Sequence, residues 1–107
     1  MLKDDVHDIW GLMDDMIENN KKAGIDDGNI AIAQDNVPLL TKVIEKTRHV
    51  IMGDEEGLRI TREIIEEFAH YGVVLSMYNS YADMVIYLKY KDIGIEVATV
   101  PKKDLIS

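Results

Sequence analysis

The spacing of the apolar residues changes once along this chain, near residue 73, and that change most constrains the fold. Before residue 73 the apolar residues recur every three or four positions, which is the period of a helix with one buried face. After residue 73 they alternate with other residues, which is the period of a β-strand. Helices followed by strands predict an α+β domain, with the helices packed on one face of an antiparallel sheet.

Three helices are expected, over residues 2–23, 36–52 and 54–71. The first carries a broad apolar stripe and should end at Gly24, a residue that suits the left-handed end of a helix. That stripe consists of Leu2, Val6, Ile9, Trp10, Leu12, Met13, Met16 and Ile17. Asp35 or Asn36 is expected to cap the second helix, with Pro38 in its first turn, where the missing N–H costs nothing.

The third helix is expected to begin at Asp54, because Gly53 should end the second helix and aspartate is a good N-cap. Its apolar face would contain Leu58, Thr61, Ile65, Phe68 and Ala69, widened by Ile60 and Ile64. Three strands should follow, over residues 73–78, 84–91 and 95–100, joined by loops short enough for hairpins. The expected architecture is therefore three helices on a three-stranded antiparallel meander.

The same order of elements also allows a winged-helix-like arrangement, in which the helix from Asp54 would be the recognition helix. The polar face of that helix carries Glu63, Glu66 and Glu67 against Arg59 and Arg62. Glutamates repel the phosphates that flank a DNA groove, so such a domain would bind protein rather than DNA.

The length of 107 residues predicts a single domain spanning residues 1–107, because two separate cores would each be too small to hold together. A chain this short gains stability by pairing, so a homodimer is a further expectation. With no cysteine, disulfides and thiolate metal sites are excluded. Neither a secretory signal nor a membrane-length apolar run is visible, and a cytoplasmic location is expected.

The net charge of −8 belongs mainly to the first third of the chain, where residues 1–36 hold 3 Lys/Arg against 9 Asp/Glu. Acidic surfaces repel nucleic acid and attract basic proteins. The leading hypothesis is a non-catalytic interaction protein of bacterial or phage type, comparable in its logic to inhibitors, immunity proteins and antitoxins. The residues expected to attract the basic partner are Asp4, Asp8, Asp14, Asp15 and Glu18.

The five tyrosines lie within residues 71–90, mostly on the expected sheet. Aromatic rings beside lysines can stack on nucleobases, and tyrosine is equally common on protein-binding surfaces and in ordinary strands. A second hypothesis is therefore a small-ligand or nucleotide-binding protein that uses Tyr78, Tyr81, Tyr87, Lys89 and Lys91. A third is a structural or assembly subunit.

Patterns that would indicate an enzyme or a metal protein are weak. Asp26-Asp27-Gly28-Asn29 has the composition of a turn and lacks the glutamate that a calcium-binding loop places at its twelfth position. The pair Glu67 and His70 has metal-ligand spacing but only one such motif exists, and Arg62 and Glu66 at helical spacing indicate a charge network instead. We expect no metal, no cofactor and no catalytic residues.

Overall fold

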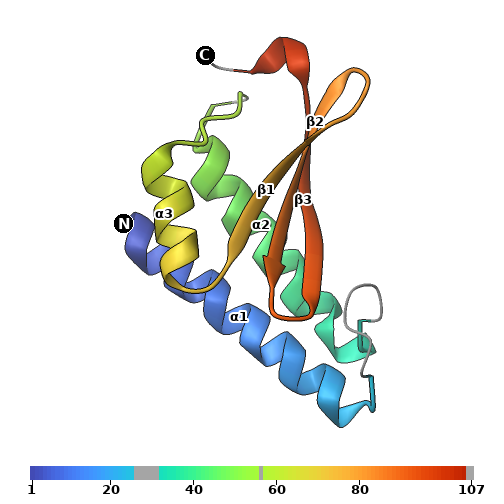
Figure 1. Cartoon of the computed structure of the whole chain (residues 1–107). Coiled ribbons are helices and arrows are strands. Elements are labelled where there is room, and N and C mark those ends of the chain that lie inside the picture. Colours follow the sequence, from blue (N-terminus) through green and yellow to red (C-terminus); the bar gives the residue numbers. More distant parts are fainter. Residues whose placement is uncertain (26–31, 56, 106–107) are drawn as a thin grey trace.

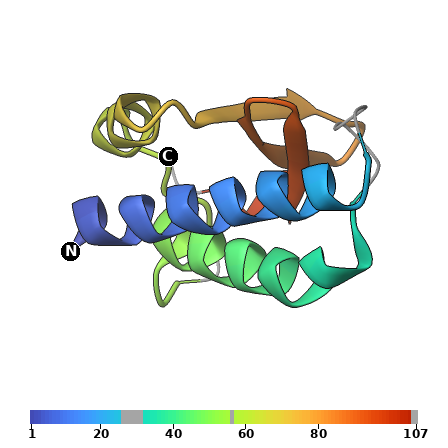
Figure 2. The ribbon, with the colours of Figure 1, turned by 90° about the horizontal axis from the view of Figure 1, so that it is seen from below.

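The computed structural model describes residues 1–25, 32–55 and 57–105, and three helices and a three-stranded antiparallel sheet lie within them. The elements in chain order are α1 (Leu2–Lys22), the 3-10 helix η1 (Gln34–Asn36), α2 (Val37–Met52), α3 (Arg62–His70), β1 (Val74–Asn79), β2 (Asp83–Tyr90), β3 (Ile93–Pro101) and the 3-10 helix η2 (Lys102–Asp104). The strand order is β1-β2-β3, and α1 and α2 lie side by side beneath one face of the sheet (Figures 1 and 2). The α+β class and the meander are confirmed.

The core lies between the inner face of the sheet and the helices. On β2, Ile86 and Leu88 are fully buried and Tyr90 nearly so, as the period of two predicts. Their helical partners include the α1 residues Val6, Ile9, Met13 and Met16, together with Val43 and Ile51 of α2 and Phe68 of α3. None of the described helices lies over the other side of the sheet, which is called the outer face below (Figure 2).

A β-bulge in β3 changes which residues face the core. Ile86 pairs with Ala98 while its neighbour Tyr87 pairs with Glu96, so Val97 is the extra residue. A regular strand over residues 95–100 would place Ile95, Val97 and Thr99 on the same face, and that expectation is wrong at Thr99. Thr99 is exposed, and both Ala98 and Val100 face the core.

The third helix begins at Arg62 rather than Asp54, which corrects the expected start by eight residues. The N-cap is Thr61, whose hydroxyl accepts a hydrogen bond from the Ile64 N–H at 3.3 Å. The segment before it is bound to other parts of the chain: Arg59 N–H donates to Ile51 O, and Leu58 forms a parallel bridge with Leu105. These long-range contacts replace the hydrogen bonds that a helix would have made.

The late start also corrects the buried face of α3. Ile64 and Phe68, four residues apart, are buried at 8% and 0% exposure, whereas Ile65 is 39% exposed.

Gly53 does end α2, with a φ of +60°. The side chain of Arg59 occupies the space where a Cβ at Gly53 would lie, and its Nε donates to the Met52 carbonyl at 3.2 Å.

A buried amide network joins the end of α1 to the start of α2. Asn36 lies at the N-cap position of α2, as expected, but its side chain makes no capping bond. The Asn36 Nδ2 group instead donates to Met16 O at 3.0 Å and to Asn20 Oδ1 at 2.8 Å. Asn36 Oδ1 accepts from Asn19 Nδ2 at 2.9 Å, and Asn20 Oδ1 also accepts from Ala33 N–H at 2.9 Å. These amides fix the antiparallel packing of the two helices. The expected turn at Asp26-Asp27-Gly28-Asn29, which follows α1 in the sequence, lies outside the described residues.

All three strands of the described residues come from the C-terminal third, and residues 32–36, which precede α2, add no strand to the sheet. Over the described part of the chain, the sheet consists of the three consecutive strands of the expected meander. In none of the described helices is there a segment both long and apolar enough to cross a membrane.

Candidate functional site

Four carboxylates line the solvent side of α1, directly opposite its buried residues. At 100° per residue, Asp4, Asp8, Asp15 and Glu18 fall within one quadrant of the helix, and we call them the acidic stripe. All four are exposed, including Asp8 beside α2. With a rise of about 1.5 Å per residue, the stripe is about 21 Å long.

The acidic stripe is only partly neutralised within the molecule. Asp8 forms an ion pair with Lys46 of α2 at 3.7 Å, and both side chains remain about half exposed, at 55% and 42%. Exposed pairs of this kind contribute little to stability because water screens them. Within residues 1–25, 32–55 and 57–105, Asp4, Asp15 and Glu18 have no ion pair. Their charges are available to an external cation.

Asp14, the fifth predicted residue, does not belong to the stripe. Its Oδ1 accepts a hydrogen bond from Lys91 Nζ at 3.3 Å and one from the Tyr90 hydroxyl at 3.5 Å. The Tyr90 hydroxyl and then the Asp14 carboxylate raise the pKa of Lys91 above its ordinary value. Asp14 therefore ties α1 to the turn between β2 and β3, where Lys91 has a φ of +51°.

A groove of about 520 Å³ lies between the acidic stripe and α2. The sequence did not predict this groove. Its lining residues are His7, Asp8, Gly11, Leu12, Asp15, Lys42 and Lys46. Gly11 leaves the α1 side open, since a Cβ there would meet nothing within 4 Å. One rim is acidic and the other is basic. The lysines of α2 could be found only from the tertiary packing, because they are more than 25 residues away in sequence.

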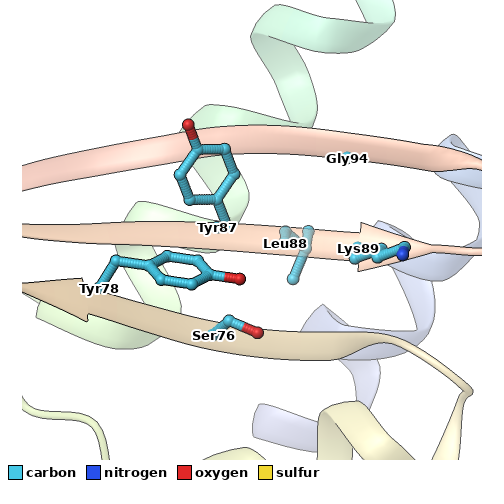
Figure 3. Close-up of a pocket in the computed structure, with 6 residues that line it drawn as sticks. All are labelled: Ser76, Tyr78, Tyr87, Leu88, Lys89 and Gly94. Atoms are coloured by element: carbon cyan, nitrogen blue, oxygen red, sulfur yellow. The ribbon is translucent and has the colours of Figure 1, made fainter. Parts of the chain in front are cut away.

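A second groove, of about 350 Å³, lies on the outer face of the sheet and is called the outer groove (Figure 3). It is lined by Ser76, Tyr78, Tyr87, Leu88, Lys89 and Gly94. The rings of Tyr78 and Tyr87 meet nearly at right angles, with centroids 5.4 Å apart and an interplanar angle of 83°. The residues predicted to bind a small ligand, here called the tyrosine surface, are Tyr78, Tyr81, Tyr87, Lys89 and Lys91. Three of these five, Tyr78, Tyr87 and Lys89, are thus brought together.

The other two residues of the predicted tyrosine surface lie elsewhere. Tyr81 is completely exposed at the tip of the β1–β2 hairpin and does not line the outer groove. Lys91 was expected to share a strand face with Tyr87 and Lys89, but β2 ends at Tyr90, and the Lys91 side chain turns toward α1. The positive φ of Lys91 redirects it, and no period-two pattern contains that information.

Two of the three histidines, His7 and His70, pack against an aromatic ring. Both contact Tyr71 edge-on, with ring centroids 5.5 Å and 5.1 Å away. Of the expected charge network on α3, the ion pair between Arg62 and Glu66 is present at 2.9 Å. Among the described residues, no group of three metal-ligating side chains comes together.

Comparison with known proteins identifies no relative: no family model matches the chain, and no curated protein or solved structure matches it either.

Proposed function

We propose that this chain is a non-catalytic protein-binding module whose acidic stripe engages a partner with a basic surface. The observation that carries the proposal is the contrast among the carboxylates of α1. Asp14 is matched by Lys91, whereas Asp4, Asp15 and Glu18 project into solvent with no ion pair in the described part of the chain. Asp14 thus has a cationic partner within the molecule, and the charges of the other three can attract a cationic group of a partner protein.

The packing of α1 against the core holds the acidic stripe in a fixed position, which makes the stripe suitable for recognising a partner. On the opposite side of α1, Val6, Ile9, Met13 and Met16 have 0% exposure, so the helix cannot rotate without opening the core. The backbone that carries the carboxylates is therefore ordered before the partner arrives. Binding then costs less conformational entropy than it would for a carboxylate-rich flexible segment.

The neighbouring lysines indicate what kind of basic surface fits. Lys42 and Lys46 form the far rim of the α1–α2 groove, so a uniformly positive partner would meet repulsion there. A partner that places lysine or arginine along the stripe and an uncharged or acidic side chain beside α2 would match both rims. The net charge of −8 would steer such a partner toward the protein and repel nucleic acid. An inhibitor, immunity or antitoxin role is the form of this proposal that the charge favours.

The test combines capture with association kinetics. The wild-type chain is immobilised, proteins retained from a bacterial extract at low salt are eluted by rising salt, and the purified partner is used for stopped-flow measurements. The variant Asp15→Lys/Glu18→Lys changes the net charge from −8 to −4, since each replacement adds two positive units. We expect its association rate constant to fall by about tenfold or more at low salt, with a flatter salt dependence.

The matched control is Glu45→Lys/Glu63→Lys, which makes the same change in net charge at two exposed residues on α2 and α3. If only the overall charge mattered, both variants would slow association equally. Equal slowing, or no slowing in the stripe variant, contradicts the proposed role of the acidic stripe.

A further inference from the structure

The outer groove gathers an aromatic pair and a lysine on the face of the sheet away from the core, and we infer that it binds a small ligand with a planar aromatic ring and an anionic group, such as a nucleoside monophosphate. Tyr87 and Lys89 point away from the core, whereas Ile86 and Leu88, which alternate with them along β2, are fully buried on the inner face. This site is on the opposite face of the sheet from α1, so the inference is independent of the acidic stripe (Figure 2).

The two tyrosines supply the contact for a ring. Because the Tyr78 and Tyr87 rings are nearly perpendicular, a planar ring that stacks on one of them meets the edge of the other. The Tyr87 ring rises from β2 beside β3, and the Tyr78 ring lies along the groove between β1 and β2 (Figure 3). The corner between the rings accepts a flat ligand better than a branched aliphatic one, since stacking needs a π-face.

The remaining lining residues supply the contacts for an anion. Lys89 is the one charged residue among the six that line the groove, and no carboxylate is among them. Across the described residues, no ion pair occupies the Lys89 ammonium. The hydroxyls of Ser76 and Tyr78 lie on the β1 side of the groove and can donate hydrogen bonds (Figure 3). An ammonium with two hydroxyl donors is a suitable environment for a phosphate or carboxylate.

The cross-strand partner of Lys89 is Gly94, which has no side chain, so the groove is open on the β3 side of Lys89. A Cβ at Gly94 would meet no atom within 4 Å, so any larger side chain would extend into the space that a ligand needs. The volume of about 350 Å³ is at the small end of ligand pockets, which hold about 300–1,000 Å³. One cation and a small groove fit a single nucleotide-sized molecule, whereas a nucleic-acid strand would be repelled by the net charge of −8.

The experiment titrates the full chain with adenosine monophosphate up to about 10 mM and follows backbone amide NMR shifts and thermal unfolding. Adenosine and inorganic phosphate are titrated separately as the two halves of the probe. We expect the largest shifts at residues lining the outer groove, a raised unfolding temperature, and at least about tenfold weaker binding of either half.

Two variants with matched controls assign the contacts. Tyr87→Leu removes the ring and keeps apolar bulk, and Lys89→Gln removes the charge. Each should weaken binding of adenosine monophosphate by about tenfold. The controls are Tyr81→Leu at the hairpin tip and Lys42→Gln on α2, which lie outside the outer groove and should bind like the wild type. Circular dichroism checks that each variant is folded, and the location of the NMR shifts in the wild type does not depend on any variant.

Several outcomes would overturn the inference. They are the absence of shifts at the highest concentration, shifts located elsewhere, equal binding of phosphate alone, and equal losses in the controls. A dimer in sedimentation at working concentrations, with NMR shifts of the outer-groove residues that change on dilution, would also overturn it. The stripe variant Asp15→Lys/Glu18→Lys should keep its affinity for adenosine monophosphate, so failure of this site and failure of the proposed protein binding are separate results.

Discussion

Neighbouring residues of β2 lie on opposite faces of the sheet and differ in their exposure to water. Leu88 on the inner face has 0% exposure, while Tyr87, one residue before it, is 38% exposed on the outer face. The inner face is set by the need to remove apolar area from water. The outer face has no such requirement, yet it holds an aromatic pair and a lysine around a groove. Residues that folding does not need are those from which function is best inferred.

The largest expected effect comes from truncating the inner face. Leu88→Ala should lower the free energy of unfolding by about 2–5 kcal/mol, because it removes transfer energy and leaves a cavity in the core. Tyr87→Ala, on the same strand, should lower it by less than about 1 kcal/mol. Urea denaturation of both variants measures the difference. Similar losses would mean that the outer face contributes to stability as the inner face does.

The buried amides at the α1–α2 junction should give the next largest effect. Asn36→Ala removes the hydrogen bonds that the Asn36 side chain makes with Asn19, Asn20 and the Met16 carbonyl, and it should cost about 1–3 kcal/mol. Asn79→Ala removes the same side chain from an exposed position on β1 and is the control. If the two variants have equal stability, the amide network does not hold the helices together.

A change on the solvent side of α1 should have the opposite sign. Gly11→Ala should raise the free energy of unfolding by about 0.5–1 kcal/mol, because alanine loses less backbone entropy in a helix. Nothing lies within 4 Å of the added methyl group, so no clash offsets the gain. A lower unfolding temperature in this variant would show that the exposed side of α1 carries a structural constraint after all.

The smallest expected effect is a pH dependence from the turn that joins β2 to β3. Because the folded state raises the pKa of Lys91, its contribution to stability is present below the unfolded pKa of about 10.4. That contribution is lost as the pH rises through the higher folded value. The stability difference between wild type and Lys91→Met should therefore shrink above about pH 10. A difference that stays constant to higher pH would contradict a folded-state role for the Lys91 charge.

Local patterns predicted the elements well where packing agrees with them. The period of the α1 apolar residues, Gly53 at the end of α2, Pro38 in the first turn of α2 and the alternation along β2 are all present. The errors fall where distant segments meet. Leu58 joins Leu105 and delays the start of α3, and the bulge at Val97 turns Thr99 outward.

The candidate sites divide in the same way. Helical spacing alone places Asp4, Asp8 and Asp15 together on one side of α1, because their angular positions depend only on sequence separation. The ion pair of Asp14 with Lys91, 77 residues away, depends on where the β2–β3 turn lies in space. The outer groove likewise needs β1 and β3 to bring Tyr78 and Gly94 beside Tyr87.

The sequence by itself determined the α+β class, the meander, the excess of negative charge on the first helix and the lack of any cysteine chemistry. These follow from composition and from periods of 3.6 and 2, which act over a few neighbouring residues. Only the tertiary structure decided which carboxylates remain without a cation, where α3 begins and how the tyrosines form a groove. Such features depend on contacts between segments far apart in the chain, and the free energy of burying the shared core selects them.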